Sequence, residues 1–317
     1  MNRFELYEKR VIKRYALVVG AVLLLSFFVE EVFSTIMVLT FNFCGYSQQE
    51  INTLLTDPWI GYSINSLFII SACVLPFCLL KFICKTPISV IGSFNSPRKA
   101  NFKSCIGFAF GFALIANIVT AIFNFILENF FNFKAITSDI GSNTTSDPFE
   151  FVFILVCSAV FPALVEEFAF RGMVLGSLRK FGDWPAILIS SIVFAVFHGN
   201  FVQIPFAFLV GVVLGIIVVI SGSIWTSVLA HFLINAYAIF ANQFQNSSLK
   251  LFATLFYVII ALGIICFVHL LKNGAFKLLN NKKLYLSTSS KFSLMLFSPT
   301  IIIFIFVMIF VALQYRA

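Results

Sequence analysis

Long apolar runs separated by short polar connections constrain the fold of this sequence more than any other feature. A helix needs about 20 mostly apolar residues to cross the hydrocarbon core of a membrane. Nine runs suggest such spans, at residues 15–39, 60–83, 104–130, 151–178, 184–202, 204–221, 223–243, 250–271 and 293–314. The fifth and sixth are joined so tightly that one of them is a candidate re-entrant segment. We therefore expect an all-α, polytopic transmembrane helix bundle of eight or nine spans, with residues 1–317 forming one transmembrane domain.

The composition excludes an ordinary soluble enzyme. Only 11% of the 317 residues are charged and 60% are hydrophobic, whereas soluble chains have about a quarter charged residues. The formal charge of +8 is a known signature of nucleic-acid binding, but here the basic residues form short clusters between apolar runs. That pattern is typical of a lipid-facing protein. We expect a multi-pass protein of the cell membrane whose partner is the lipid bilayer, and no nucleic-acid partner.

The distribution of basic residues predicts how the chain is threaded. Cytoplasmic loops of membrane proteins are enriched in Lys and Arg. Under the nine-span threading, 18 of the 21 Lys and Arg residues lie on one side, and only Lys134, Lys250 and Arg316 lie on the other. The threading therefore predicts a cytoplasmic amino terminus and an external carboxyl terminus.

Three charged residues lie inside the fourth apolar run, in the segment VEEFAFR at 165–171. Charges inside hydrocarbon cost several kcal/mol, so they usually face the bundle interior and serve a function. Glu167 and Arg171 are four residues apart on a helix and are expected to pair. Glu166 points about 100° away from Glu167, which leaves it without that partner and makes it a candidate general base. The alternative is a buried ion-pair network with a structural role only.

Two histidines also lie deep in apolar runs. His198 follows Phe194 by one helical turn, and His231 precedes Asn235 by one turn. At 1.5 Å per residue, Glu166, His198, His231 and Asn235 lie about 15 to 22 Å from the same predicted cytoplasmic face. We therefore expect these four side chains to meet near the middle of the membrane.

A second acidic pair, Glu30 and Glu31, lies toward the predicted outer end of the first run and has no basic residue one turn later. We expect an interfacial or gating role for this pair.

The three motifs together resemble those of a known family. EExxxR (Glu166, Glu167, Arg171), FxxxH (Phe194, His198) and HxxxN (His231, Asn235) follow one another on successive runs. This order resembles the CPBP family of CAAX proteases and bacteriocin-processing proteins, also called Abi, which is related to the eukaryotic Ras-converting CAAX endopeptidase. The resemblance covers residues 150–245, which we expect to form the catalytic core.

The resemblance implies an intramembrane endopeptidase with a peptide or membrane-protein substrate. By that analogy Glu166 activates the attacking water with help from His198. His231 and Asn235 donate hydrogen bonds to the oxyanion, while Glu167, Arg171 and Phe194 support these groups. The family is often named a metalloprotease, so zinc held by Glu166, His198 and His231 is one option. A catalytic zinc site needs three protein ligands plus water. If Glu166 were one of these ligands, it could not also act as the base. We favour glutamate-dependent catalysis without an obligatory metal.

Two other functions remain open at this stage. A non-catalytic bacteriocin self-immunity or peptide-binding membrane protein would use the same cavity without cleaving a substrate. A transporter would use the buried acids and imidazoles to carry ions, but it predicts inverted repeats with matched features in both halves, and the sequence has no evident internal repeat.

Overall fold

The computed structural model describes residues 3–84, 93–131, 144–280 and 285–314, and all regular structure in these ranges is helical, which confirms the all-α class. Lys85, Lys134, Lys282, Lys283 and Arg316, which entered the charge analysis, lie outside these ranges. The main helices are α1 (Arg3–Phe43), α2 (Gln48–Thr56), α3 (Pro58–Cys84), α5 (Lys99–Phe131), α6 (Pro148–Leu155), α7 (Phe161–Glu166), α9 (Asp183–Phe197), α10 (Ile204–Ser221), α11 (Ile224–Lys272), α12 (Thr288–Leu296) and α13 (Pro299–Gln314).

Seven helical segments are long and apolar enough to cross a membrane, and α12 with α13 would form an eighth span that is bent by 60°. This confirms a multi-pass membrane protein, although the nine predicted runs do not all become full spans. The run predicted at 184–202 forms α9, which has only 15 residues. Its length is about 22 Å, shorter than a hydrocarbon core of about 30 Å.

Helices α9 and α10 form a hairpin in which α10 is long enough to cross a membrane and α9 is shorter. The hairpin begins where the backbone N–H of Asp183 donates to the carbonyl of Asn280, and it ends where the N–H of Arg98 donates to the carbonyl of Ser221. Both ends therefore lie among the basic segments, and the turn after His198 lies within the bundle. Gly199 adopts a left-handed φ of 58° at that turn, a conformation that glycine accepts without steric cost.

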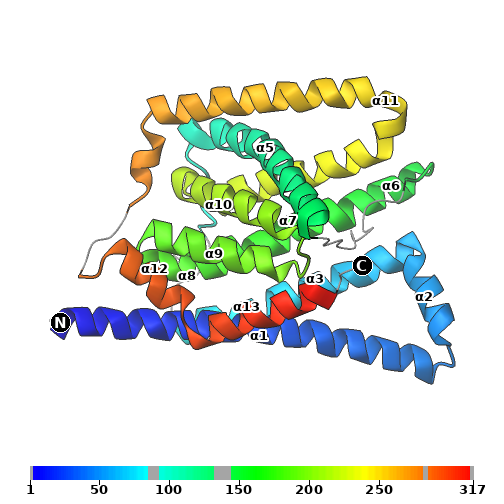
Figure 1. Ribbon diagram of the computed structural model, residues 1–317, viewed down its shortest axis with the longest axis horizontal. Helices are drawn as coiled ribbons and strands as arrows, with labels where there is room; N and C mark the ends of the chain where they lie inside the picture. Colours follow the sequence, from blue (N-terminus) through cyan, green and yellow to red (C-terminus); the bar gives the residue numbers. More distant parts are fainter. Residues whose placement is uncertain (1–2, 85–92, 132–143, 281–284, 315–317) are drawn as a thin grey trace.

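Helix α11 is assigned as one helical element, but it contains two apolar stretches, Ile224–Phe244 and Lys250–Lys272, with a bend between them (Figure 1). Figure 1 shows that the chain doubles back between them, so that the second stretch runs over α5. The two helices approach closely at Gly111 and Gly263, where a Cβ added to Gly111 would lie 2.6 Å from the Cα of Gly263. Small residues permit such close helix packing in membranes.

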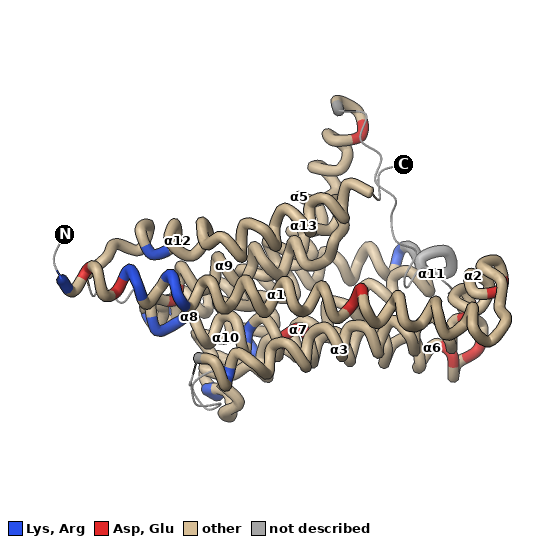
Figure 2. The backbone as a smooth tube through the Cα atoms, turned by 90° about the horizontal axis from the view of Figure 1, so that it is seen from below, with Lys and Arg blue, Asp and Glu red and all other residues tan. Residues whose placement is uncertain are grey.

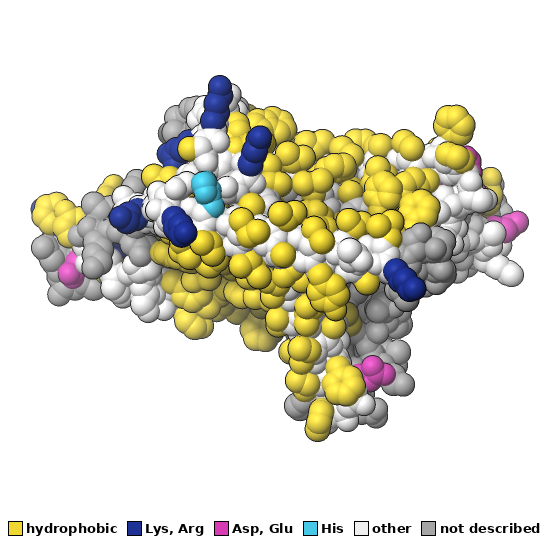
Figure 3. Space-filling view, turned by 90° about the horizontal axis from the view of Figure 1, so that it is seen from above, with side chains coloured by type: hydrophobic (Ala, Val, Ile, Leu, Met, Phe, Trp, Pro, Cys, Tyr) yellow, Lys and Arg dark blue, Asp and Glu magenta, His cyan; other side chains and the backbone are white. Residues whose placement is uncertain are grey.

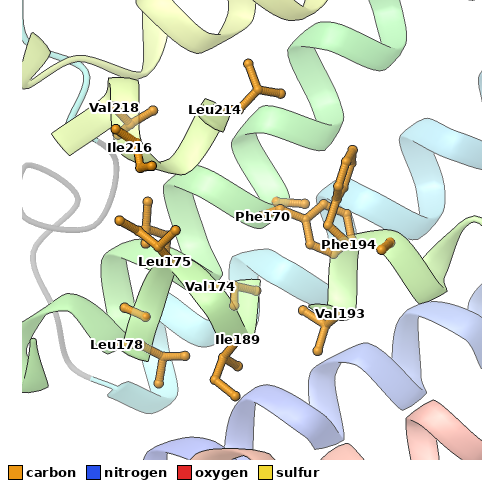
Figure 4. Packing of buried hydrophobic residues seen from close by; sticks show 14 of the residues in the cluster. Phe170, Val174, Leu175, Leu178, Ile189, Val193, Phe194, Leu214, Ile216 and Val218 are labelled. Atoms are coloured by element: carbon orange, nitrogen blue, oxygen red, sulfur yellow. The ribbon is translucent and has the colours of Figure 1, made fainter. Parts of the chain in front are cut away.

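The α9–α10 hairpin occupies the centre of the bundle. In Figure 1, α1, α3, α12 and α13 lie on one side of it, while α5 and the second half of α11 lie on the other. Two thirds of the apolar stretch of α10 is buried (67%), against 6% of the Lys250–Lys272 stretch. The latter is therefore a lipid-facing helix. Figure 4 shows branched aliphatic and aromatic side chains of α10, α9 and the segment around Phe170 packed into one core.

The charged residues are separated along the long axis of the molecule. In Figure 2, most Lys and Arg residues gather at the end that holds the amino terminus, and several acidic residues lie at the opposite end near α2 and α6. Figure 3 shows a broad hydrophobic surface between the two ends. This arrangement suits a helix bundle embedded in lipid, while the direction of insertion stays a prediction from the charge bias.

Cys44 offers a test of that direction because it is a free, exposed thiol just beyond the carboxyl end of α1. If the amino terminus is cytoplasmic, Cys44 faces the outside, and a membrane-impermeant maleimide will label it in intact cells. The Cys44→Ser variant should lose this labelling. Labelling of Cys44 only after the membrane is permeabilised would reverse the predicted topology.

Candidate active site

The span that carries the first motif has an irregular helical backbone. After α6 it changes to a π-helix, η1 (Val156–Val160), returns to an α-helix in α7, and changes again to a π-helix, η2 (Glu167–Leu175). Pro162 lies in the first turn of α7, where its missing N–H disturbs the helical hydrogen-bond ladder. Turns of π-helix are rare and occur frequently at functional sites. Glu166 and Glu167 stand at the junction of α7 and η2.

Glu167 and Arg171 form the predicted ion pair. Nη1 of Arg171 donates to Oε1 of Glu167 at 2.8 Å, and the two side chains are 1% and 0% exposed. Removing one member of a buried pair leaves an uncompensated charge and costs several kcal/mol. The pair is therefore a fixed part of the bundle interior.

His231 connects this pair to Glu166. Its Nδ1 lies 3.0 Å from the same Oε1 of Glu167, and its Nε2 lies 3.9 Å from Oε2 of Glu166. Because the carboxylate of Glu167 is already paired with a guanidinium, it accepts this hydrogen bond and Nδ1 carries the hydrogen. The ring is thereby oriented with Nε2 toward Glu166. The sequence did not predict the contact between His231 and Glu167, because it joins two helices that are 64 residues apart.

Phe194 lies at the centre of the three motifs. Its ring packs beneath the guanidinium of Arg171, with 4.1 Å from Cζ to the ring centroid. It also makes edge contacts with the rings of His198 and His231, at centroid distances of 4.8 and 6.1 Å. Figure 4 shows it beside Phe170 in the core, and the two centroids are 5.1 Å apart. Phe194 was predicted to be a supporting residue, but its contact with Arg171 could not be read from the sequence.

His198 is half-buried at the carboxyl end of α9, where its Nδ1 lies 2.9 Å from the carbonyl oxygen of Phe194. Since a carbonyl only accepts, Nδ1 carries the hydrogen and Nε2 is left as an acceptor. Within the described residues, no hydrogen bond or ion pair joins His198 to Glu166. A chain of contacts runs from His198 through Phe194 and His231 to Glu166.

Asn235 is half-buried one turn after His231 on α11, so both side chains leave the helix on the same face. In the part of the chain that the structure describes, its amide makes no protein hydrogen bond. The amide is therefore available to a bound molecule.

Two carboxylate oxygens at the site are buried without a hydrogen-bond partner among the described residues. They are Oε2 of Glu166 and Oε2 of Glu167. Buried polar atoms are rarely left unsatisfied, and such cases often mark a water or a functional role. The distance of 3.9 Å from Oε2 of Glu166 to Nε2 of His231 is too long for a direct hydrogen bond, but one water molecule can contact both atoms.

The three residues considered as zinc ligands do not form a zinc site. Glu166 and His231 present Oε2 and Nε2 to each other at 3.9 Å, but the described residues contain no group of three or more His, Cys, Asp or Glu side chains placed to hold a metal ion. His198 does not complete the set. The Glu166, His198 and His231 ligand set therefore does not fit this geometry, since a catalytic zinc needs three protein ligands.

Glu30 and Glu31 lie on α1. Glu31 is exposed and Glu30 is half-buried. Helix α1 contacts α3 at this level through the hydroxyl of Ser26, which donates to the carbonyl of Ala72 at 2.7 Å. The interfacial or gating role of Glu30 and Glu31 stays a prediction.

Comparison with protein families finds a match that covers residues 148–237. The matching family is described as type II CAAX prenyl endopeptidase Rce1-like. The matched residues run from the start of α6 into the first half of α11 and include all three motifs. They confirm the family resemblance that the sequence suggested. No curated protein and no solved structure matches the chain.

Replacing Glu167 by glutamine tests the buried ion pair. The substitution keeps the side-chain shape but leaves Arg171 as a buried, unpaired cation, so we expect the free energy of unfolding to fall by about 3 to 5 kcal/mol. Thermal unfolding in detergent measures the change. Glu31→Gln is the matched control, because Glu31 is also an acid of an apolar helix but is exposed, and it should change stability by less than about 0.5 kcal/mol. Equal losses for both variants would contradict the pairing.

Proposed function

We propose, from the match of residues 148–237 to the Rce1-like family, that this chain is an intramembrane endopeptidase whose catalytic core comprises residues 150–245. The family match indicates a CAAX-type membrane protease in general terms. The assignment of residues to steps is our proposal. This assignment rests on a buried row of side chains. Arg171 pairs with Glu167, Glu167 contacts His231, and His231 faces Glu166.

The proposed site binds the attacking water between Glu166 and His231. Oε2 of Glu166 has no hydrogen-bond partner among the described residues, and Nε2 of His231 faces it. Glu166 acts as the general base and takes a proton from the water as its oxygen attacks the peptide carbonyl carbon. Positioned general bases contribute about 10²- to 10⁴-fold to such reactions. Nε2 of His198, which the bond from Nδ1 to Phe194 leaves free, accepts a second hydrogen bond from the same water.

The oxyanion formed by this attack needs fixed hydrogen-bond donors. We assign this role to Nε2–H of protonated His231 and to the amide of Asn235, one turn further along α11. Glu167 stabilises the imidazolium through Nδ1. Once Glu166 has taken the proton from the water, the positive charges of Arg171 and His231 are balanced by Glu167 and the oxyanion. Donors already oriented in a low-dielectric site stabilise the transition state without reorganisation. The intermediate collapses when the C–N bond breaks and Glu166 returns its proton to the departing amine.

The substrate is proposed to be a peptide or a membrane protein. The site lies within a bundle with a broad apolar surface (Figure 3), and its catalytic groups belong to helices that cross or enter the membrane. A substrate segment therefore reaches the site from the lipid or from the end that carries the basic residues. The family description names a CAAX prenyl endopeptidase, and a CAAX-type substrate is one member of this substrate class. A small leader or signalling peptide is another.

Glu166→Gln tests the proposal directly. The variant preserves shape but cannot accept the proton, so cleavage should fall at least about 100-fold. The membrane peptidomes of wild-type and Glu166→Gln cells are compared, and uncleaved precursors should accumulate in the variant. Glu128→Gln, at an exposed acid near the carboxyl end of α5, serves as the control and should leave the peptidome unchanged. Normal processing by Glu166→Gln would contradict the enzyme assignment and favour a peptide-binding or self-immunity function.

Metal removal tests the choice between the two kinds of protease. Since Glu166, His198 and His231 do not form a three-ligand site, we expect the purified protein to keep its cleavage activity, within about twofold, after treatment with a zinc chelator. Elemental analysis of the same sample measures bound zinc. Stoichiometric zinc whose removal abolishes cleavage would show that the site rearranges to bind a metal.

A further inference from the structure

Gly211 of α10 borders the site although it belongs to none of the three motifs. Its carbonyl oxygen lies 3.4 Å from Nη2 of Arg171. A Cβ added to Gly211 would lie 3.3 Å from Cδ1 of Phe194 and 3.2 Å from Cβ of Ser191. The backbone carbonyl of Gly211 therefore contacts the guanidinium of Arg171. The phenyl ring of Phe194 lies next to the position that a side chain at residue 211 would occupy.

The guanidinium of Arg171 is held from three helices. Nη1 donates to Glu167 within η2, Nη2 makes a long hydrogen bond to Gly211 of α10, and the face of the guanidinium rests on Phe194 of α9. Two of these three contacts depend on the approach of α10 at position 211. Because Arg171 and His231 share Oε1 of Glu167, a displacement of Arg171 also displaces the imidazole.

We infer that Gly211 is a positioning residue of the site. The absence of a side chain lets Phe194 lie beneath Arg171, and the Gly211 carbonyl fixes the guanidinium, so that Glu167 orients His231 toward Glu166. The kinetic consequence rests on the proposed peptidase function, whereas the effect on the orientation of His231 does not.

Gly215 provides a matched control one turn further along α10. A Cβ added there would lie 3.1 Å from Cγ2 of Ile187, so an alanine is as crowded as at position 211. Both substitutions also add the same helix propensity. Ile187 is a buried core residue of α9 four residues before Ser191, and it does not touch Arg171, Phe194 or His231 in the contacts described above. The two variants thus differ mainly in whether the displaced neighbour belongs to the site.

The first measurement is steady-state cleavage of a precursor identified from the peptidome comparison. Gly211→Ala should lower kcat by about tenfold or more and leave KM within about twofold, because misplacement of catalytic groups affects the chemical step. Gly215→Ala should keep both constants within about twofold of the wild-type values.

The second measurement does not need a substrate. The chain contains only three histidines, so the ring nitrogens of ¹⁵N-histidine-labelled protein can be assigned with one substitution variant per histidine. At a fixed pH, Gly211→Ala should move the Nδ1 and Nε2 signals of His231, because these signals report its hydrogen bonds. Gly215→Ala should leave them in place. Phe194→Leu, which removes the ring beneath Arg171, should move the same signals and serves as a second variant if Gly211→Ala does not fold.

Combining the substitutions tests whether they act through one contact. Gly211→Ala and Phe194→Leu should be non-additive, so that the double variant loses no more activity than the worse single variant. The inference is overturned if Gly211→Ala behaves like Gly215→Ala, or if kcat and the His231 signals do not change together. Full activity of Glu166→Gln would instead refute the proposed function, and the spectra would still decide whether Gly211 positions His231.

Discussion

The buried charge of Arg171 is the constraint on which the site depends. A guanidinium on a residue that is only 2% exposed in an apolar bundle must be neutralised and hydrogen-bonded, because an unpaired charge there costs several kcal/mol. Glu167 neutralises it, Phe194 lies beneath it and Gly211 accepts from it. These partners come from η2, α9 and α10. His231 of α11 joins them through Glu167, so one cation fixes the relative positions of four helical segments.

The same constraint sets Glu166 apart from its neighbour. Glu167 uses one oxygen for both Arg171 and His231, whereas Glu166, the preceding residue, reaches no cation within hydrogen-bond distance in the described parts of the chain. The junction between α7 and the π-helix η2 separates the two roles. A structural acid and a candidate general base therefore stand side by side in the sequence, and the backbone geometry gives them different surroundings.

The sequence predicted the features that follow from spacing along one helix. Apolar runs predicted the helical spans, and the four-residue interval predicted the pair of Glu167 and Arg171. It did not predict contacts that depend on how helices rotate and tilt against one another. The bond between His231 and Glu167, the cation–π contact of Phe194 and the approach of Gly211 are of this kind. The predicted span at 184–202 is longer than helix α9, which ends at Phe197. The sequence did not mark this end clearly, because a short turn at His198–Gln203 leads directly into a second apolar helix.

The central claim is that Glu166, His231, His198 and Asn235 surround one hydrated position inside the bundle. An experimental structure of the protein in lipid, at a resolution that shows ordered water, tests it most directly. We predict one water within hydrogen-bond distance of both Oε2 of Glu166 and Nε2 of His231, with Nδ1 of His231 bound to Glu167. Density that places the Glu166 and His231 side chains in separate cavities, or Glu166 against lipid chains, would contradict it.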